Sequence, residues 1–394
     1  MSKLIEITGK PISGEWGSDD LAGTGIPVLR TTNFTNEGIV NYSNIVTRQI
    51  KKKNIAEKML RYGDIILEKS GGSDNQPVGR VVFFEGEENK YLFNNFTGVL
   101  RIQDTNKWHP KYVFYALFTS YVSGGTVCYE NRTTGLHNLR TDSYVSSVEI
   151  PDRTIDEQIA IVEHIDTIVK IIRLYKDQVS NLDVLVKSRF IELFGDPLIE
   201  DDRYPRVPLG SLAEVGSSKR IFEKEYVSEG IPFYRTKEIV ELSKGNRITT
   251  ELFITKERYD EIRSEYGVPQ KGDLLISAVG TIGVIWIVDG KNDFYFKDGN
   301  LLRVSATEKF VPEYLKHLLE ALISAYKSEM SSGTAYAALT ISALKEMMVY
   351  DVPYAEQKQF ATFVTQTDKS KVVIQKALDE AQLLFDSLMQ KYFG

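Results

Sequence analysis

Cysteine and histidine are scarce in this chain of 394 residues, which has one cysteine and four histidines. The single cysteine, Cys128, excludes an internal disulfide and favours a reducing compartment. We expect its thiol to be buried, because a free cysteine behaves as a small hydrophobic side chain. His109, His137, His164 and His317 stand in unrelated contexts without cysteine partners at zinc spacing, so no metal site is predicted.

Long apolar runs are also missing. The most apolar stretch, residues 274–288, is shorter than a membrane span and is interrupted by Gly280 and Gly283, which predicts two buried strands. Residues 1–10 lack the apolar core of a signal peptide. With 42% hydrophobic and 26% charged residues, the composition is typical of a globular protein. We expect two domains, located in the cytoplasm and away from membranes.

Signatures of nucleotide chemistry and of a basic coat are absent as well. No Gly-x-x-x-x-Gly-Lys-Ser/Thr loop occurs, which argues against an ATP motor in this chain. The formal net charge of −6 argues against a generally basic nucleic-acid surface. Any DNA binding therefore has to rest on local groups of lysine and arginine.

What the sequence does contain is a long amphipathic segment in its middle. Apolar residues recur there in steps of four and three, which keeps one stripe facing a partner helix. Glu157-Gln158 precedes the stripe, and Phe194-Gly195-Asp196-Pro197 ends it, because proline cannot continue a helix. A single helix packed on a globular core would also fit this stripe. The predicted seam residues are Ile161, Ile165, Ile168, Ile172, Tyr175, Val179, Leu182 and Val186.

A second copy of this segment favours a pair of helices. Glu356-Gln357 lies 199 positions after Glu157-Gln158, and Phe393-Gly394 lies the same distance after Phe194-Gly195. A repeat this long predicts two copies of one unit. Thr367 and Lys371 interrupt the second stripe. Its predicted apolar seam residues are Phe360, Val364, Ile374, Leu378, Ala381, Phe385 and Leu388.

The segments in front of the two helices repeat too. Gly-Ile-Pro-Val-Leu-Arg-Thr from Gly25 matches Gly-Ile-Pro-Phe-Tyr-Arg-Thr from Gly230, and Gly63-Asp64 matches Gly272-Asp273 ahead of a hydrophobic strand. β-branched and aromatic runs separated by Gly and Asn turns predict strands. The fold class predicted is α+β, with two similar mixed domains and two long helices. Since the ends of a domain usually lie close together, the helices should pair antiparallel, with an approximate two-fold axis.

Two short motifs suggest enzyme activity. Asp351-Val352-Pro353-Tyr354 loosely resembles the tetrapeptide with which adenine methyltransferases hold a flipped base, but one proline and the cofactor loop are missing. Asp273 with Asp289-Gly290-Lys291, and Asp64 with Glu88-Asn89-Lys90, have the spacing of magnesium nucleases. Asp-Gly-Lys-Asn is equally typical of a hairpin turn, and we favour the structural interpretation of both motifs.

Basic groups and polar loops are candidates for DNA contacts. Lysine neutralises phosphates, and Arg, Asn, Ser and Thr can contact base edges. Turn chemistry is the alternative explanation, because turns are rich in Gly, Ser, Thr and Asn. The candidate DNA-binding residues are Arg30, Thr31, Asn33, Lys51, Lys52, Lys69, Ser70, Asn131, Arg132, Lys219, Arg220, Arg235, Thr236, Lys237, Ser277, Thr334 and Tyr336.

The order and repetition of these motifs resemble the DNA-specificity subunit of type I restriction–modification enzymes. The resemblance covers essentially the whole chain and implies target-recognition domains at 1–155 and 197–353, with long helices at 156–196 and 354–394. It implies a non-catalytic subunit of a bacterial or archaeal defence system against foreign DNA. Each domain would read one half of a split, asymmetric sequence in double-stranded DNA, and the helices would act as a ruler.

The resemblance also implies partners. Two modification subunits would bring S-adenosylmethionine and methylate adenine, and restriction subunits would bring ATP and Mg²⁺, so that this chain itself binds no cofactor. Two alternatives remain open. An autonomous nuclease or methyltransferase would show activity as a lone chain, and a coiled-coil scaffold would show no salt-dependent DNA binding.

Overall fold

The computed structural model describes residues 1–394 except 53, 133–136, 200–201, 306–308 and 331–337. The chain divides into two compact units, one formed by Met1–Lys176 with Lys376–Gly394 and the other by Asp177–Gln375. Within the residues described, none of the helices combines the length and apolar character that a membrane crossing requires.

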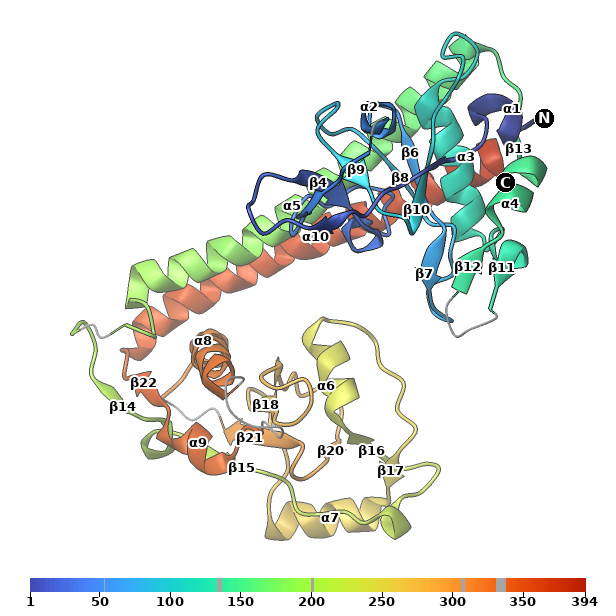
Figure 1. Ribbon diagram of the computed structural model, residues 1–394. Helices are drawn as coiled ribbons and strands as arrows, with labels where there is room; N and C mark the ends of the chain where they lie inside the picture. The colour runs from blue at the N-terminus through green and yellow to red at the C-terminus, as the bar shows by residue number, and fades with distance from the viewer. Residues whose placement is uncertain (53, 133–136, 200–201, 306–308, 331–337) are drawn as a thin grey trace. The chain divides into compact units, whose positions relative to one another are not determined.

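Two helices of 40 residues each, α5 (Ile155–Phe194) and α10 (Tyr354–Phe393), run side by side (Figure 1). Of the predicted seam residues, Ile161, Ile165, Ile172, Val186, Phe360 and Val364 are buried and the others are partly buried, so none lies on the exposed face. Thr367, which interrupts the second stripe, is also buried.

Contacts within each unit show that the two helices are antiparallel. In the first unit, Ile161 and Ile165 near the start of α5 share a core with Met389 near the end of α10. In the second unit, Phe190 near the end of α5 packs on Phe360 near the start of α10, with ring centroids 5.3 Å apart.

The first unit surrounds a four-stranded antiparallel sheet in the order β2-β10-β6-β8, with α3 packed against β8. A second sheet, β3-β5-β4-β9, contains one parallel pairing, β4 with β9. The helices and strands of the first unit that precede α5 are β1 (Ser2–Lys3), α1 (Leu4–Thr8), β2 (Ile12–Ser13), β3 (Ser18–Asp19), β4 (Ile26–Leu29), β5 (Val46–Gln49), α2 (Ile55–Lys58), β6 (Ile65–Glu68), β7 (Ser70–Gly72), β8 (Val81–Phe83), β9 (Leu92–Phe93), β10 (Thr97–Leu100), α3 (Pro110–Val122), β11 (Glu130–Asn131), β12 (His137–Leu139), α4 (Thr141–Ser147) and β13 (Glu149–Ile150).

The second unit is built around the sheet β15-β21-β18-β19, and a smaller sheet has the order β17-β16-β20. Its elements are β14 (Arg206–Pro208), β15 (Glu214–Gly216), β16 (Ile231–Tyr234), α6 (Thr236–Ser243), β17 (Phe253–Ile254), α7 (Lys256–Glu265), β18 (Leu274–Ser277), β19 (Ile285–Ile287), β20 (Tyr295–Phe296), β21 (Leu301–Ser305), α8 (Pro312–Met330), α9 (Ile341–Glu346) and β22 (Met348–Tyr350). The apolar stretch 274–288 thus forms two adjacent strands, as predicted.

The strand pairings repeat between the units. Val28 pairs in parallel with Leu92, and Phe233, at the matching position, pairs in parallel with Tyr295. Each central sheet has the same strand order, and β1-β13 has its equivalent in β14-β22. The predicted fold class, two similar mixed domains with two long antiparallel helices, is confirmed.

The repeated Glu-Gln motif anchors each long helix to its domain. Gln158 is fully buried: its Oε1 accepts a hydrogen bond from the backbone N–H of His109 at 2.8 Å, and its Nε2 donates to Lys107 and Arg153 carbonyls. Gln357 repeats this pattern with the N–H of Val311 and two carbonyls of its own domain. Each glutamine therefore holds the loop before a proline-headed helix, α3 or α8.

The structure also places the single cysteine and the carboxylates of the nuclease-like motif. The expectation that Cys128 is buried was wrong: its side chain is exposed, with Sγ directed at the Gly125 carbonyl.

Asp64 of the nuclease-like spacing accepts two hydrogen bonds from the Arg101 guanidinium, and Asp273 accepts from Gln270 N–H and Ser305 Oγ. These carboxylates therefore hold turns together. No group of three possible metal ligands occurs among the described residues.

Candidate nucleic-acid interface

The clearest pair of candidates is Arg30 and Arg235, which follow the equivalent strands β4 and β16. The Arg30 backbone N–H donates to Asn33 Oδ1 at 3.0 Å, and that of Arg235 donates to Glu238 Oε2 at 2.8 Å. Both side chains are partly buried, and the Nε of each is buried without a hydrogen-bond partner in the described chain. Each guanidinium also donates within its own domain, Arg30 Nη2 to the Asn44 carbonyl at 3.0 Å and Arg235 Nη2 to Glu238 Oε1 at 3.2 Å.

Two other candidates have structural roles. Asn33 is buried, and its Nδ2 donates to the carbonyls of Asn41 and Ser43. Ser277 is fully buried and its Oγ accepts from Val284 N–H at 2.9 Å. The polar atoms of Asn33 and Ser277 hold turns, which is the alternative explanation given for such residues above. DNA contacts are therefore proposed for the other candidate residues.

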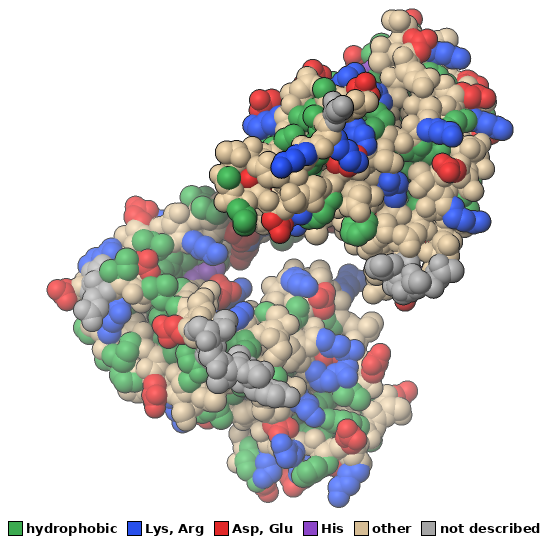
Figure 2. All heavy atoms as spheres, in the orientation of Figure 1, with side chains coloured by type: hydrophobic (Ala, Val, Ile, Leu, Met, Phe, Trp, Pro, Cys, Tyr) green, Lys and Arg blue, Asp and Glu red, His purple; other side chains and the backbone are tan. Residues whose placement is uncertain are grey.

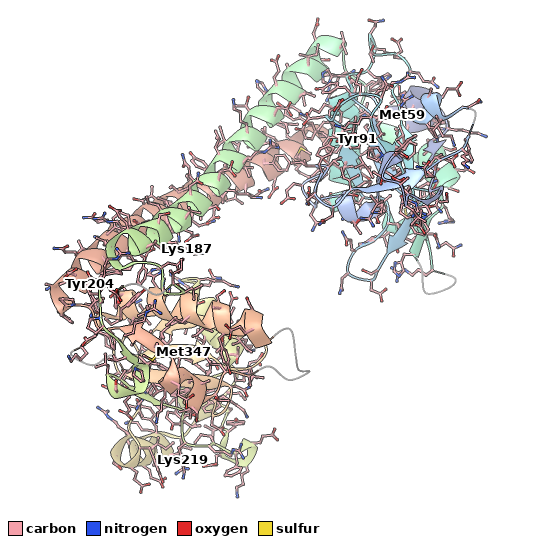
Figure 3. All side chains as sticks on the ribbon, turned by 60° about the vertical axis from the view of Figure 1, so that its left-hand side comes forward. Met59, Tyr91, Lys187, Tyr204, Lys219 and Met347 are labelled. Carbon is pink, nitrogen blue, oxygen red and sulfur yellow. The ribbon has the colours of Figure 1, made fainter. Side chains whose placement is uncertain are left out.

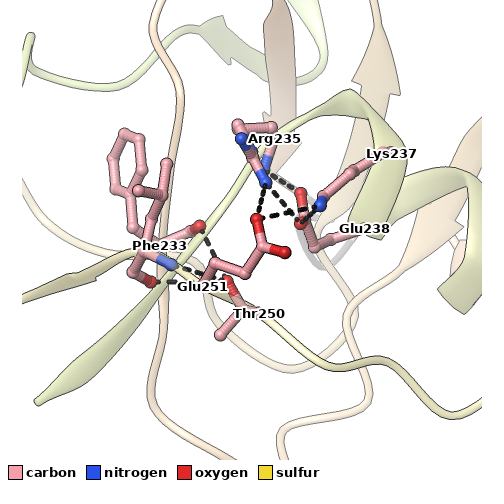
Figure 4. Close-up of polar contacts among 7 residues, drawn as sticks. Phe233, Arg235, Lys237, Glu238, Thr250 and Glu251 are labelled. Carbon is pink, nitrogen blue, oxygen red and sulfur yellow. Dashed lines mark hydrogen bonds and ion pairs between the residues drawn. The ribbon is translucent and has the colours of Figure 1, made fainter. Parts of the chain in front are cut away.

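Around Arg235, opposite charges form a small network (Figure 4). Arg235 Nη2 lies 3.2 Å from Glu238 and 3.8 Å from Glu251, and Lys237 Nζ lies 3.6 Å from the same two carboxylates. Glu238 is buried whereas Glu251 is exposed. The hydroxyl of Thr236 is buried nearby without a partner in the described chain. A phosphate or base edge could replace Glu251 without opening the core.

In the first unit, the candidate Lys52 and the nearby Lys58 are neutralised by one carboxylate. Lys52 and Lys58 both reach Glu15, at 2.7 and 2.6 Å, and these hydrogen bonds lower the pKa of the Glu15 carboxyl. Lys51 is exposed and has no ion pair within the described residues. Of these three lysines, Lys51 is thus the one whose charge is not offset by a carboxylate of the described chain.

Lys69 and Ser70 lie at the end of β6. Burial, followed by repulsion from Lys58, lowers the pKa of the Lys69 ammonium, and no carboxylate in the described chain pairs with it. Ser70 Oγ donates to Asn138 Oδ1, which joins β7 to β12. A half-buried ammonium without an anion suits a phosphate.

The candidate Asn131 lies in β11 of the sheet β11-β12-β7 and Arg132 follows it, near His137 and two carboxylates. Arg132 lies 3.2 Å from Glu130, and the two ring nitrogens of His137 lie 3.3 Å from Glu130 and 3.6 Å from Asp74. This grouping is not recognisable in the sequence, because Asp74 is distant in the chain from Glu130, Arg132 and His137 and no motif links them.

In the second unit, Lys219 and Arg220 follow β15, and Figure 3 labels Lys219 on this unit. The Lys219 Nζ lies 4.7 Å from the ring centre of Tyr266, and Arg220 Nε lies 2.9 Å from Asp298. Thr334 and Tyr336 fall outside the described residues. On the face shown in Figure 2, lysine and arginine side chains are interspersed with acidic ones in both units.

Comparison with known proteins finds similarity to one family. Residues 203–382 match the family model described as type I restriction modification DNA specificity domain. Over these residues the chain is therefore similar to the type I restriction–modification DNA specificity family. A type I restriction enzyme specificity subunit from Haemophilus influenzae is 27% identical over 212 residues, 53% of this chain. That match spans about half of the relative, 51% of its length. The type I restriction enzyme MjaX specificity subunit from Methanocaldococcus jannaschii is 20% identical over 402 residues, covering 96% of this chain and 89% of the relative.

Solved structures of this specificity family have the same fold. The crystal structure of the type I restriction–modification system S subunit from M. genitalium is 16% identical and matches with a TM-score of 0.57, covering 100% of this chain and 95% of that one. A chain from a structure on complex assembly and conformational transition of the type I R-M system, also 16% identical, matches with a TM-score of 0.56 over 100% of this chain and 96% of that chain.

Proposed function

We propose that this chain is the DNA-reading subunit of a type I restriction–modification complex. Each domain reads one half of a split, asymmetric sequence in double-stranded DNA, and the helical pair carries two modification subunits. The observation that supports this most directly is the arginine that follows β4 and β16, whose backbone N–H is held by the side chain three residues later in both domains. The residues around these arginines differ, Asn33 in one and Glu238 in the other, so the two half-sites should differ.

The chain itself is non-catalytic in this proposal. S-adenosylmethionine belongs to the modification subunits, and ATP and Mg²⁺ belong to separate restriction subunits, in the cytoplasm. The proposed contact residues are Arg30, Thr31, Lys51, Lys52, Lys69, Ser70, Asn131, Arg132, Lys219, Arg220, Arg235, Thr236 and Lys237. Arginine reads guanine edges and lysine neutralises phosphates, which would make the affinity strongly dependent on salt.

The decisive experiment is a methylation map of DNA from cells that express the chain with its modification partner, compared with cells that lack the chain. A split motif carrying N6-methyladenine, lost on deletion, would support the proposal. An unchanged map from a complex that still forms would contradict it and favour a scaffold. Methylation or cleavage by the purified chain alone would favour an autonomous enzyme.

The arginine network can be tested in the same complex. Arg235→Ala combined with Lys237→Ala should weaken DNA binding and reduce the dependence of log affinity on log salt by about one for each phosphate that is no longer neutralised. Lys376→Gln is the matched control, since Lys376 is an exposed lysine of α10 that pairs within its own helix with Glu380. An equal loss of affinity in this control would assign the effect to net charge.

A further inference from the structure

The seam of the helical pair contains one charged residue where its repeat is apolar. Lys371 occupies a seam position of α10, and its side chain is 27% exposed and pairs with Asp183 of α5. The residue 199 positions earlier is Ile172, which is buried. The residue 199 positions after Asp183 is Gln382, whose Nε2 donates to Asp386 of its own helix. The ion pair between the helices therefore breaks the symmetry of the repeat.

An ion pair this exposed adds little stability of its own, because water screens both charges and the side chains lose freedom. The ion pair matters because other alignments of the two helices would leave its charged side chains without partners. A single polar residue in a helical seam specifies register, since every other register leaves it without a partner.

One-heptad shifts illustrate this. Sliding α10 by seven residues along α5 would bring Lys371 level with Phe190 in one direction and with Lys176 in the other. Asp183 would meet Val364 or Leu378. One shift thus places an ammonium against an aromatic core residue, and the other brings two ammonium groups together. Only the observed alignment pairs both charges.

We infer that Asp183 and Lys371 fix the axial register of α5 against α10, a positioning role that the apolar seam alone does not supply. Apart from Thr367, the remaining seam residues are aliphatic or aromatic and recur every seven positions, so a shift by one heptad leaves mostly apolar side chains facing apolar side chains. The inference depends on the helical contacts alone and does not require the proposed function.

Register can be read in the full chain by cysteine cross-linking. The exposed Cys128 is first replaced by Ser, which removes the native thiol. Val179→Cys is then combined with Ile374→Cys for the observed register, or with Ala381→Cys or Thr367→Cys for the two shifted registers. We expect disulfide formation in the first pair and little in the other two.

The test is the double variant Asp183→Gln with Lys371→Ile, which gives both positions the residues of the other repeat. It should raise cross-linking of at least one shifted pair severalfold, whereas the charge exchange Asp183→Lys with Lys371→Asp should restore the original pattern. Lys376→Gln is the control for loss of a lysine outside the seam. If the double variant folds and cross-links only in the observed register, the domain cores set the alignment and the inference is wrong. Circular dichroism establishes that each variant is folded.

Discussion

At the scale of single residues, the two buried glutamines explain why a short motif recurs ahead of each long helix. Glu157-Gln158 and Glu356-Gln357 are recognisable as a repeat in the sequence, but the reason for it is not, since two of the three partners of each amide are backbone groups about 50 residues away. Backbone partners leave no side-chain pattern in a sequence. The same limit applies to Asn33 and Ser277, whose residue types suit DNA and turns equally well.

Gln158→Ala and Gln357→Ala should each destabilise the chain by roughly 3 kcal/mol, because each leaves an N–H and two carbonyls unsatisfied in a buried place. Urea unfolding measures the loss. Gln366→Ala, on an exposed position of α10, is the control and should change stability little. A loss below about 1 kcal/mol for both buried variants would mean that water replaces the amide.

Glu15 predicts a dependence of stability on pH. Hydrogen bonds from Lys52 and then Lys58 lower the pKa of its carboxyl below the ordinary value of 4.5. The ionised form is therefore favoured in the folded state, so the stabilisation is complete above that ordinary value and is lost as the pH falls through the folded value. Glu15→Gln should be less stable than the unmodified chain at pH 6, and the difference should shrink on acidification towards pH 3. Thermal unfolding across this range would contradict the assignment if the difference stayed constant.

At the scale of elements, the long helices were the most predictable part, because a stripe in steps of four and three has few structural interpretations. Short strands with Gly turns were recognised as strands, but their order could not be predicted, since strand order depends on contacts between distant segments. The equivalent Arg-Thr segments also diverged: one forms a 3₁₀ turn at Thr31–Asn33 and the other a helix at Thr236–Ser243. Only the second continues with residues that favour a helix.

The outer face of α10 carries apolar side chains that the seam leaves exposed. Val372, Val373, Leu383 and Leu384 are each at least half exposed, and exposed apolar surface commonly marks a protein-binding site. Val373→Asp combined with Leu384→Asp should leave the chain folded but abolish co-purification with the modification partner. Unchanged co-purification would place the partner elsewhere. Lys376→Gln, on the same helix, should have no effect.

At the scale of the whole molecule, the internal repeat determined most of what could be predicted: two domains, two helices and their antiparallel pairing. Under the proposed function, the DNA sequence that is read could not be predicted, because it depends on the residues in which the two copies differ. Two of the candidate contact residues, Thr334 and Tyr336, fall outside the described part of the chain.

The repeat also predicts that each domain reads its half of the DNA motif independently of the other domain. Replacing residues 1–150, which end with β13, by the recognition domain of another family member should change one half of the methylated motif and leave the other unchanged. A methylation map of the chimera with its modification partner would show this. A change in both halves, from a chimera that still forms the complex, would contradict independent reading.

The first unit is completed by the last part of the chain, since Met389 belongs to its core and the ring of Phe393 packs 5.1 Å from that of Tyr112. The second unit, in contrast, is one continuous stretch. During synthesis the N-terminal domain therefore emerges first but acquires its full core last, after residues 177–375 have been able to fold. Truncation of a few C-terminal residues should thus damage the domain at the opposite end of the sequence.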